Sequence, residues 1–349
     1  MKCTIQNIAD HLGLSRNTVS KALKNSSEVS ENTRNLVIKT ASKLGYKNAT
    51  FATPVIPASE TGSNGTILFL TRTYASDSEF WTTVLRGIES ILSNANYHLA
   101  ISIMSDSDLK QLNFPQTISD SSIKGIILVE ICDKVVCDAL SQFNLPIVSV
   151  DMPNVPFEEL NGIDVVTMES KKNLKKIINL LIEKGAESFG FVGDLYSPNV
   201  SRGFQERYNA LSECLAEHQL PLNQKNCLLH QTPEDFRNFQ TTVNNLQAMI
   251  SLPDVFICGN DWTAIQLIYA LQFLGFQIPK DICVVGFDNI PAASRISPSL
   301  TTISTPQKYL GIAAARQILE RIQHPNCPHV FCQYETELII RNSTNITSF

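Results

Sequence analysis

The sequence predicts a small all-α head of the helix-turn-helix type and an α/β core of two doubly wound parallel-sheet subdomains. Basic residues concentrate in residues 1–50, with eight Lys and Arg side chains against three acidic ones, although the 349-residue chain carries a net charge of −5. Apolar residues recur at helical spacing in the same segment. From Thr66 onward, continuous apolar strands alternate with amphipathic helices, which is typical of parallel sheets covered on both faces.

Residues 4–23 predict two short helices around a tight turn. Gly13 supplies the left-handed backbone conformation that a sharp turn between packed helices requires. Ser15 is a good N-cap, so the second helix should begin at Arg16. A polar, basic outer face is typical of a helix that reads DNA, and an ordinary helical hairpin at a domain edge is the alternative. The outer face of the second helix carries Arg16, Asn17, Ser20 and Lys21.

A third helix should begin after Ser30 and end at Gly45, which suits the residue after a helix C-terminus. The following residues are rich in Ala, Thr, Ser and Pro and keep no helical period, so they predict a linker. We therefore expect a head over 1–47, a linker or hinge over 48–64 and a core over 65–349.

The core repeats a strand-then-helix rhythm, and this rhythm restarts near residue 164. The strands are too many for one compact sheet, so two α/β subdomains are expected. We expect strands over 66–70, 97–102, 125–130, 146–150, 164–168, 188–193, 228–229, 255–259 and 283–287. We expect helices over 80–92, 203–217, 235–250 and 261–274, and another through Leu174 and Leu181.

Other patterns exclude several classes of protein. No apolar N-terminal segment and no run approaching about 20 apolar residues is present, so we expect a cytoplasmic protein. Nine scattered cysteines fit reduced thiols. Phosphate-loop and nucleophile-elbow motifs are absent, so we expect no enzyme and no cofactor. One Cys/His cluster lacks zinc-site spacing and is interpreted as a loop running into a strand, without metal: His324, Cys327, His329 and Cys332.

Several ordered motifs resemble the lactose-repressor (LacI/GalR) family of bacterial transcriptional regulators. The head motifs are TIQNIADHLGLSRNTVSKAL, NSSEVSENTR (25–34) and KLGY (43–46). The core motifs are VLRGIES (84–90), FICGNDWTAIQLIYALQFLGFQIPKDICVVGFDN (256–289) and SPSLTTI (297–303). The resemblance implies a ligand-responsive, sequence-specific repressor of carbohydrate uptake or catabolism genes, which binds double-stranded operator DNA as a homodimer. The alternative is a small-molecule binding protein that has lost operator binding.

The resemblance also implies which residues contact DNA. Arg16 and Asn17 match the two positions that chiefly read bases, and Arg suits guanine as Asn suits adenine. Lys21 matches a further base or phosphate contact. Hydroxyl groups at helix starts either hold phosphates or only cap their helices. The full expected set is Thr4, Ser15, Arg16, Asn17, Thr18, Ser20, Lys21, Ser30 and Thr33.

The core resembles a periplasmic sugar-binding protein, which implies a cleft for a sugar or sugar derivative. Arg207 matches the family's effector-binding arginine, and Asp288 matches a ligand-contacting aspartate. Asp261 faces the cleft in this pattern or merely caps the helix that it begins. Phe80 follows the first strand, where aromatic ligand contacts are common, but its burial is a rival interpretation. The full expected set is Phe80, Trp81, Asp151, Arg207, Asn260, Asp261 and Asp288.

The family's pattern further implies three crossings between subdomains, near 164–168, 290–305 and 330. The N-terminal subdomain would then hold about 65–165 and 304–330, and the C-terminal subdomain about 166–303 and 331–345.

Relatives also place a hinge helix after the head, with a leucine that wedges into the minor groove. Pro54 stands at that position and pushes Thr53 out of the helical region. We therefore expect this chain to bend its operator less and to rely more on Arg16, Asn17 and Lys21.

Overall fold

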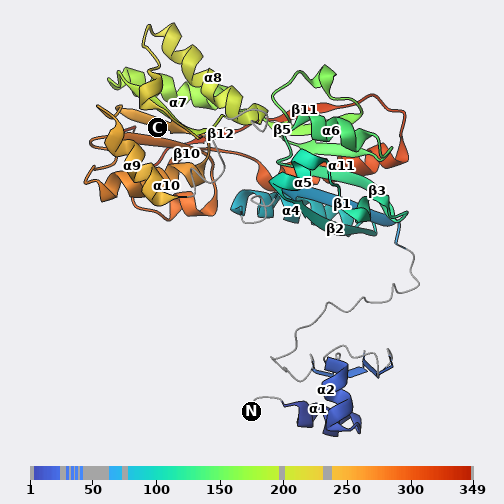
Figure 1. The fold of residues 1–349 in the computed structure, drawn as a ribbon. Helices are drawn as coiled ribbons and strands as arrows, with labels where there is room; N and C mark the ends of the chain where they lie inside the picture. Colours follow the sequence, from blue (N-terminus) through green and yellow to red (C-terminus); the bar gives the residue numbers. More distant parts are fainter. Residues whose placement is uncertain are drawn as a thin grey trace. The chain divides into compact units, whose positions relative to one another are not determined.

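The computed structural model describes residues 4–23, 29–30, 33–34, 36–37, 40–41, 63–72, 78–195, 201–230 and 238–346. The chain divides into two compact units, Met1–Gly62 and Ser63–Phe349 (Figure 1). The expected linker, its Pro54 and the question of a hinge helix lie outside the described residues. No helix of the described part of the chain is long and apolar enough to cross a membrane.

The first unit contains α1 (Ile5–Leu12) and α2 (Arg16–Leu23). Thr4 caps α1 by accepting the N–H of Asn7, and Gly13 ends it with φ 64°. The described residues between 33 and 41 are helical, in line with the predicted third helix. Of the neighbouring residues Leu36 and Val37, Leu36 is 51% exposed and Val37 is fully buried. The core of this unit contains Ile8, Ala9, Val19, Ala22, Val29, Val37 and Ala41.

The second unit contains two six-stranded sheets, which Figure 1 shows as two lobes. The first sheet is parallel throughout, in the order β11-β5-β4-β3-β1-β2. Its strands are β1 (Gly65–Arg72), β2 (Tyr97–Met104), β3 (Ile123–Val129), β4 (Ile147–Val150), β5 (Ile163–Met168) and β11 (Phe331–Tyr334). Its helices are α4 (Glu79–Leu92), α5 (Asp106–Gln111), α6 (Lys134–Ser141) and α11 (Gln307–Gln323).

Two apolar clusters show that this sheet is covered on both faces. Ile67 of β1 packs in the cluster that contains residues of α4 and α11. The neighbouring Leu68 packs in the cluster that contains residues of α5 and α6. Successive side chains of a strand point to opposite faces, so the helices lie on both sides and the sheet is doubly wound.

The second sheet has the order β12-β10-β9-β8-β6-β7, and only β12 runs antiparallel to its neighbour. Its strands are β6 (Phe189–Asp194), β7 (Leu228–His230), β8 (Val255–Cys258), β9 (Cys283–Asp288), β10 (Thr301–Ser304) and β12 (Glu337–Ile339). Its helices are α7 (Lys172–Glu183), α8 (Arg202–Glu217), α9 (Phe239–Ala248) and α10 (Asp261–Phe273). Four 3-10 helices complete the described part: Gln116–Ser119, Phe157–Glu159, Gln224–Asn226 and Pro291–Ser294. The predicted fold class is confirmed.

The crossings between the two sheets differ from the expected boundaries. β5 pairs with β4 up to Val150–Val166 and continues to Met168, so residues 166–168 belong to the first sheet. β11 pairs with β5, which places 331–334 in the first sheet and not in the C-terminal subdomain. The third crossing therefore lies between Tyr334 and Glu337, later than expected near 330. Both errors come from strand pairing between segments that are far apart in sequence.

α11 joins the first sheet after the second crossing and packs closely on α4. A Cβ atom on Gly311 would lie 2.0 Å from the carbonyl oxygen of Val84, and one on Gly87 would lie 2.1 Å from that of Lys308. Only glycine permits this backbone approach, so we infer that α4 and α11 form one rigid pair. The sequence did not predict α11, because small buried residues such as Ala314 and Ala315 weaken its apolar period.

Candidate functional site

The outer face of α2 presents the residues expected to read DNA. Arg16 and Asn17 are exposed at the start of the helix, and Ser20 and Lys21 are partly exposed one turn later. Val19 of the same helix is buried in the head core, which directs the polar side chains outward. The helix therefore presents an amide and two cations on one accessible face, which suits hydrogen bonds to base edges and phosphates.

The expected phosphate-binding hydroxyl groups cap their own helices. Ser15 Oγ accepts the N–H of Thr18 at 3.0 Å and lies 2.8 Å from its Oγ1. Ser30 Oγ accepts the N–H of Thr33 at 3.4 Å. Thr4 belongs to a capping box with Asn7. The capping interpretation is thus supported for these positions, and phosphate contacts from them stay a prediction.

Acidic residues gather where strands of both sheets end. Glu130 follows β3 and Asp151 follows β4, while Asp194 and Asp288 end β6 and β9. Glu130, Asp151 and Asp288 have positive φ values of 58°, 71° and 115°. Such backbone strain outside glycine gathers at functional sites, and open α/β sheets bind ligands at the carboxyl ends of their strands.

Arg207 of α8 is a buried cation of this region, with 4% of its surface exposed. Its Nη1 donates a hydrogen bond of 2.6 Å to the carbonyl oxygen of Gly259. Its guanidinium carbon lies 3.6 Å from the ring centroid of Phe287. Burial lowers the pKa of Arg207, and the charges of Asp288 and Asp151 oppose that shift. Arg207 therefore depends on a carboxylate from each sheet.

Asp151 and Asp288 are themselves desolvated. Burial raises the pKa of Asp151, against hydrogen bonds from Met152 N–H and Ser201 and the charge of Arg207. Burial raises the pKa of Asp288 well above its ordinary value, and Arg207 again opposes the shift. The carbonyl oxygen of Asp288 accepts a 2.7 Å hydrogen bond from Gln307 Nε2 at the start of α11. This hydrogen bond ties the backbone at the end of β9 to the start of α11, beside the second crossing.

Asn260 and Asp261 have structural partners. Asn260 Oδ1 caps α10 by accepting the N–H of Thr263 at 2.9 Å. The carboxylate of Asp261 is fully buried and accepts the N–H of Ile290 at 2.9 Å and the hydroxyl of Thr302 at 2.5 Å. Both of its oxygens are engaged inside the protein, so the expected effector contact of Asp261 is not supported. The cap is Asn260 and not Asp261.

Phe80 and Trp81 begin α4 and contact each other edge to face, with ring centroids 4.6 Å apart. Phe80 is 6% exposed and packs in the core, as the rival interpretation holds. Trp81 forms a hydrogen bond with Glu130, so its ring lies beside the acidic strand ends. Of this pair, Trp81 is the better candidate for a ligand contact.

Glu130, Asp194 and Ser170 belong to the same region but were not predicted. Glu130 and Asp194 each end or follow an apolar strand, which is the rule that identified Asp151 and Asp288. The sequence therefore contained a signal for these two acids. Ser170 lies just after β5, and its position depends on where the first crossing falls.

The Cys/His cluster near residue 330 surrounds a buried ion pair. Arg321 Nη2 and Nε donate to the two carboxylate oxygens of Asp164 at 2.8 and 3.0 Å. Arg321 also donates to the carbonyl oxygens of Cys327 and Pro328. Among the described residues, no group of three or more His, Cys, Asp or Glu side chains is arranged to hold a metal ion. Hydrogen bonds from Arg321 thus hold this loop in place, and the loop runs into β11 as expected.

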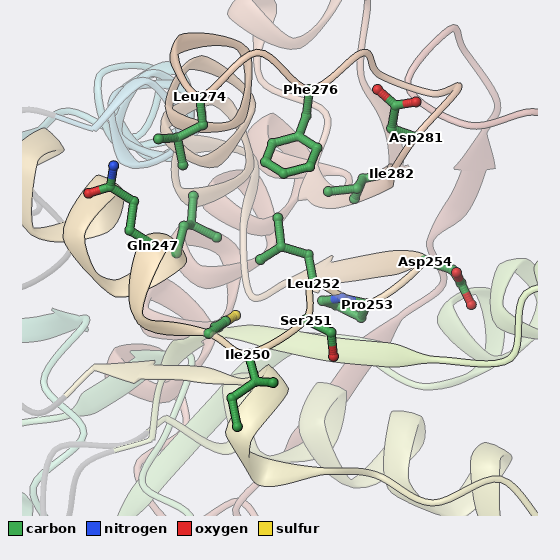
Figure 2. A pocket seen from close by; sticks show the side chains of 12 residues that line it. Gln247, Ile250, Ser251, Leu252, Pro253, Asp254, Leu274, Phe276, Asp281 and Ile282 are labelled. Carbon is green, nitrogen blue, oxygen red and sulfur yellow. The ribbon is translucent and has the colours of Figure 1, made fainter.

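A surface pocket of about 470 Å³ lies elsewhere, where β8 and β9 begin. Figure 2 shows Leu252, Phe276 and Ile282 on its apolar wall, with Asp254 and Asp281 at its edge. The expected effector residues instead follow the other ends of these strands. None of them lines this pocket.

The buried Asp261 predicts a pH dependence of stability. Burial raises its pKa from 3.8 to about 7. The folded chain therefore binds the proton more tightly than the unfolded chain, and the free energy of unfolding should fall as pH rises from about 4 to 7, by at most about 1.4 kcal/mol per unit for one group. In urea denaturation, Asp261→Asn should make this slope smaller and leave the part due to the other buried carboxyl groups with a raised pKa, Glu130, Asp151 and Asp288. Exposed Glu320→Gln should leave the slope unchanged. An unchanged slope in Asp261→Asn would contradict the buried-charge interpretation.

Known proteins match both units. Residues 4–48 match the family model "Bacterial regulatory proteins, lacI family", and residues 178–344 match "Periplasmic binding protein-like domain". The ribose operon repressor of Haemophilus influenzae is 27% identical over 344 residues, 97% of this chain and 98% of that protein. The repressor PurR of Photobacterium profundum is 26% identical over 345 residues, with the same coverage.

Solved structures of regulators also match this chain. A CelR–cellobiose complex matches with a TM-score of 0.69 and 19% identity, over 98% of this chain and 100% of that chain. The lac repressor dimer bound to operator and the anti-inducer ONPF matches with a TM-score of 0.67 and 20% sequence identity, over 99% of both chains. A LacI-family regulator of Enterococcus faecium with bound ribose matches with a TM-score of 0.65 and 25% sequence identity, over 80% of this chain and 98% of that chain.

The named relatives are transcriptional repressors rather than enzymes. With its helix-turn-helix head and two-sheet core, the chain belongs to the lacI family of bacterial regulatory proteins and is a DNA-binding transcriptional regulator.

Proposed function

We propose that this regulator is a cytoplasmic repressor that binds a pseudopalindromic operator as a homodimer and responds to a small effector in its cleft. One observation carries the proposal: the same chain exposes Arg16 and Asn17 on α2 and buries Arg207 where the charges of Asp151 from one sheet and Asp288 from the other act on it. A binding protein without operator contacts would have no use for the basic face of α2. The alternative of lost operator binding is therefore not favoured.

The effector of this proposal is a sugar or sugar derivative, and the controlled genes serve carbohydrate uptake or catabolism. Solved relatives hold ribose and cellobiose, and one curated relative is a ribose operon repressor. A guanidinium with nearby carboxylates and an aromatic ring suits ligand hydroxyl groups. The residues proposed to contact the effector are Trp81, Asp151, Arg207, Asn260 and Asp288.

The proposed boundaries follow the observed strands. The head covers 1–47 and the linker 48–64. The N-terminal subdomain covers 65–168 and 305–334, and the C-terminal subdomain covers 169–304 and 335–345.

A signal between cleft and operator would pass through the crossings. Asp151 comes from the first sheet and Asp288 from the second, so a ligand that binds both fixes the angle between the sheets. The backbone of Asp288 is bonded to Gln307, which begins α11. The packing of α11 on α4 then carries the movement into the N-terminal subdomain.

Two exposed apolar surfaces suit pairing with a second copy. Trp262, Tyr269 and Phe273 are exposed at spacings that place them on one side of α10, and Phe273 is 69% exposed. Ile101 and Ile103 are exposed on β2, which is the edge strand of the first sheet. Exposed apolar surfaces of this kind commonly mark protein interfaces, so we assign the homodimer contact to α10 and β2.

The base-reading role of α2 is testable by substitution. Arg16→Ala and Asn17→Ala should each weaken operator binding by about 5- to 150-fold, which corresponds to the 1–3 kcal/mol of one bidentate base contact. The operator would be selected from random duplexes, and affinities would be measured by gel shift. His11→Ala, also exposed in the head, is the control. Equal affinity in all four proteins would exclude this face as the reader.

Effector response is tested by a titration. Sugars that raise the melting temperature are added to the protein–operator complex, and the operator affinity is measured without ligand and at saturation. The affinity should change, and by linkage the operator should change the sugar's affinity by the same factor. If the operator affinity stayed constant with every stabilising ligand, the proposed switch would be wrong.

The dimer surface predicts a change of assembly state. Phe273→Glu places a charge on the apolar side of α10 and should convert the dimer to monomers, measured by sedimentation or light scattering. Val135→Glu is the matched control, because Val135 is an exposed apolar residue on α6. A dimeric Phe273→Glu protein would place the interface elsewhere.

A further inference from the structure

We propose that Glu130 is a further effector-binding residue and that it selects an effector bearing an ammonium group, such as an amino sugar, over neutral and anionic analogues. The inference rests on the proposed function of the cleft and adds the charge class of its ligand. Glu130 was not among the residues that the family resemblance pointed to.

The position of Glu130 shows a carboxylate prepared for a partner. It follows β3 at the ligand-binding end of the first sheet, in a left-handed conformation with φ 58°. Its Oε2 is buried and has no hydrogen-bond partner among the described residues. A buried polar oxygen without a donor costs free energy, so a ligand that supplies the donor gains affinity.

Two other buried polar atoms of the proposed cleft also have no hydrogen-bond partner among the described residues. Ser170 Oγ and Arg207 Nε lack hydrogen-bond partners within the described part of the chain, and Ser170 is only 1% exposed. A Cβ atom on Gly203 would lie 3.3 Å from Arg207 Nη2 and 3.5 Å from Ser170 Oγ, so these two side chains meet beside the start of α8. The cleft thus offers a donor, a hydroxyl group and a carboxylate to a polyhydroxyl molecule.

The charge balance favours a cation at Glu130. Arg72 lowers the pKa of Glu130, but its Nη2 is already bonded to Asp106 at 2.6 Å. Arg207 is shared between Asp151 and Asp288. Carboxyl groups therefore outnumber guanidinium groups at the described strand ends, and burial raises the pKa of three of them, Glu130, Asp151 and Asp288, so that protons supply part of the missing positive charge. An ammonium group would relieve this excess, whereas a phosphate or carboxylate group on the ligand would increase it.

The burial of Glu130 also predicts how the affinity for an amine depends on pH. Burial raises the pKa of Glu130 to about 7, and the charges of Asp151 and Asp194 raise it while Arg72 and the hydrogen bond with Trp81 lower it. A proton and a ligand ammonium group compete for the carboxylate, so affinity for the amine should rise as pH increases from about 5 to 7, a range in which an amino group of this kind keeps its proton. The charged and titratable groups that face Glu130 are Arg72, Cys132, Asp151, Asp194 and Asp288.

The test uses the full chain and three matched probe sets. The sets are the amino sugars glucosamine, galactosamine and mannosamine, their neutral parents, and the 6-phosphates of those parents, with binding measured by calorimetry and operator release by gel shift. At pH 7 one amino sugar should bind at least tenfold more tightly than its parent. This preference should shrink toward pH 5, where Glu130 takes up a proton.

Variants separate the charge from the rest of the site. Glu130→Gln keeps the shape of the side chain and should remove the preference for the amine, because it lowers the affinity for the amino sugar much more than the affinity for its neutral parent. Glu89→Gln, exposed on α4, should behave as wild type. If Glu130→Gln fails to fold, the pH profile of the unmodified chain still decides.

The outcomes distinguish the two proposals. Tightest binding and operator release by a neutral sugar or a phosphate would overturn the charge inference and leave the proposed function standing. A preference for the amine that survives Glu130→Gln, or that does not change with pH, would also overturn it. Operator affinity that responds to no probe of any set would overturn the amino-sugar inference, while the wider sugar titration given above decides the proposed function by itself.

Discussion

The buried charge of Arg207 is the constraint on which the core depends. A guanidinium group removed from water needs carboxylates close by, and isolated burial would cost several kcal/mol. Here the carboxylates come from different sheets, Asp151 after β4 and Asp288 at the end of β9. Charges from both subdomains therefore act on Arg207. A ligand that binds beside Arg207 would meet the same charges from both sheets.

This arrangement follows from parallel strands. Each parallel sheet directs its strand ends to one side, and the crossings bring the two sets of ends together. The side chains within the strands are mostly buried on both faces of each sheet. The polar residues that could bind a ligand therefore lie just beyond the strands. Three of these, Glu130, Asp151 and Asp288, adopt positive φ values that keep their carboxylates at the strand ends. Fold and site thus have one physical origin.

Much of this could be predicted from the sequence, because the signals are local. Continuous apolar runs predicted β1, β3 and β9, and Gly13 with the Ser15 cap predicted α1 and α2. The failures are non-local. β11 belongs to the first sheet only because it pairs with β5 across more than 150 residues. The engagement of Asp261 depends on Thr302, and the loop near residue 330 depends on the Arg321–Asp164 pair. No single-segment pattern contains these contacts.

The exposed apolar side of α10 and the head belong to different compact units of the chain, and this has a genetic consequence. Pairing through α10 requires no contribution from α2, so a chain with a damaged head would still assemble with an intact one. A pseudopalindromic operator needs one head for each half-site. Mixed dimers would then be inactive, and head mutations should be dominant over the wild-type copy. Mutations that disrupt α10 should instead be recessive, because such chains never enter the mixed dimer.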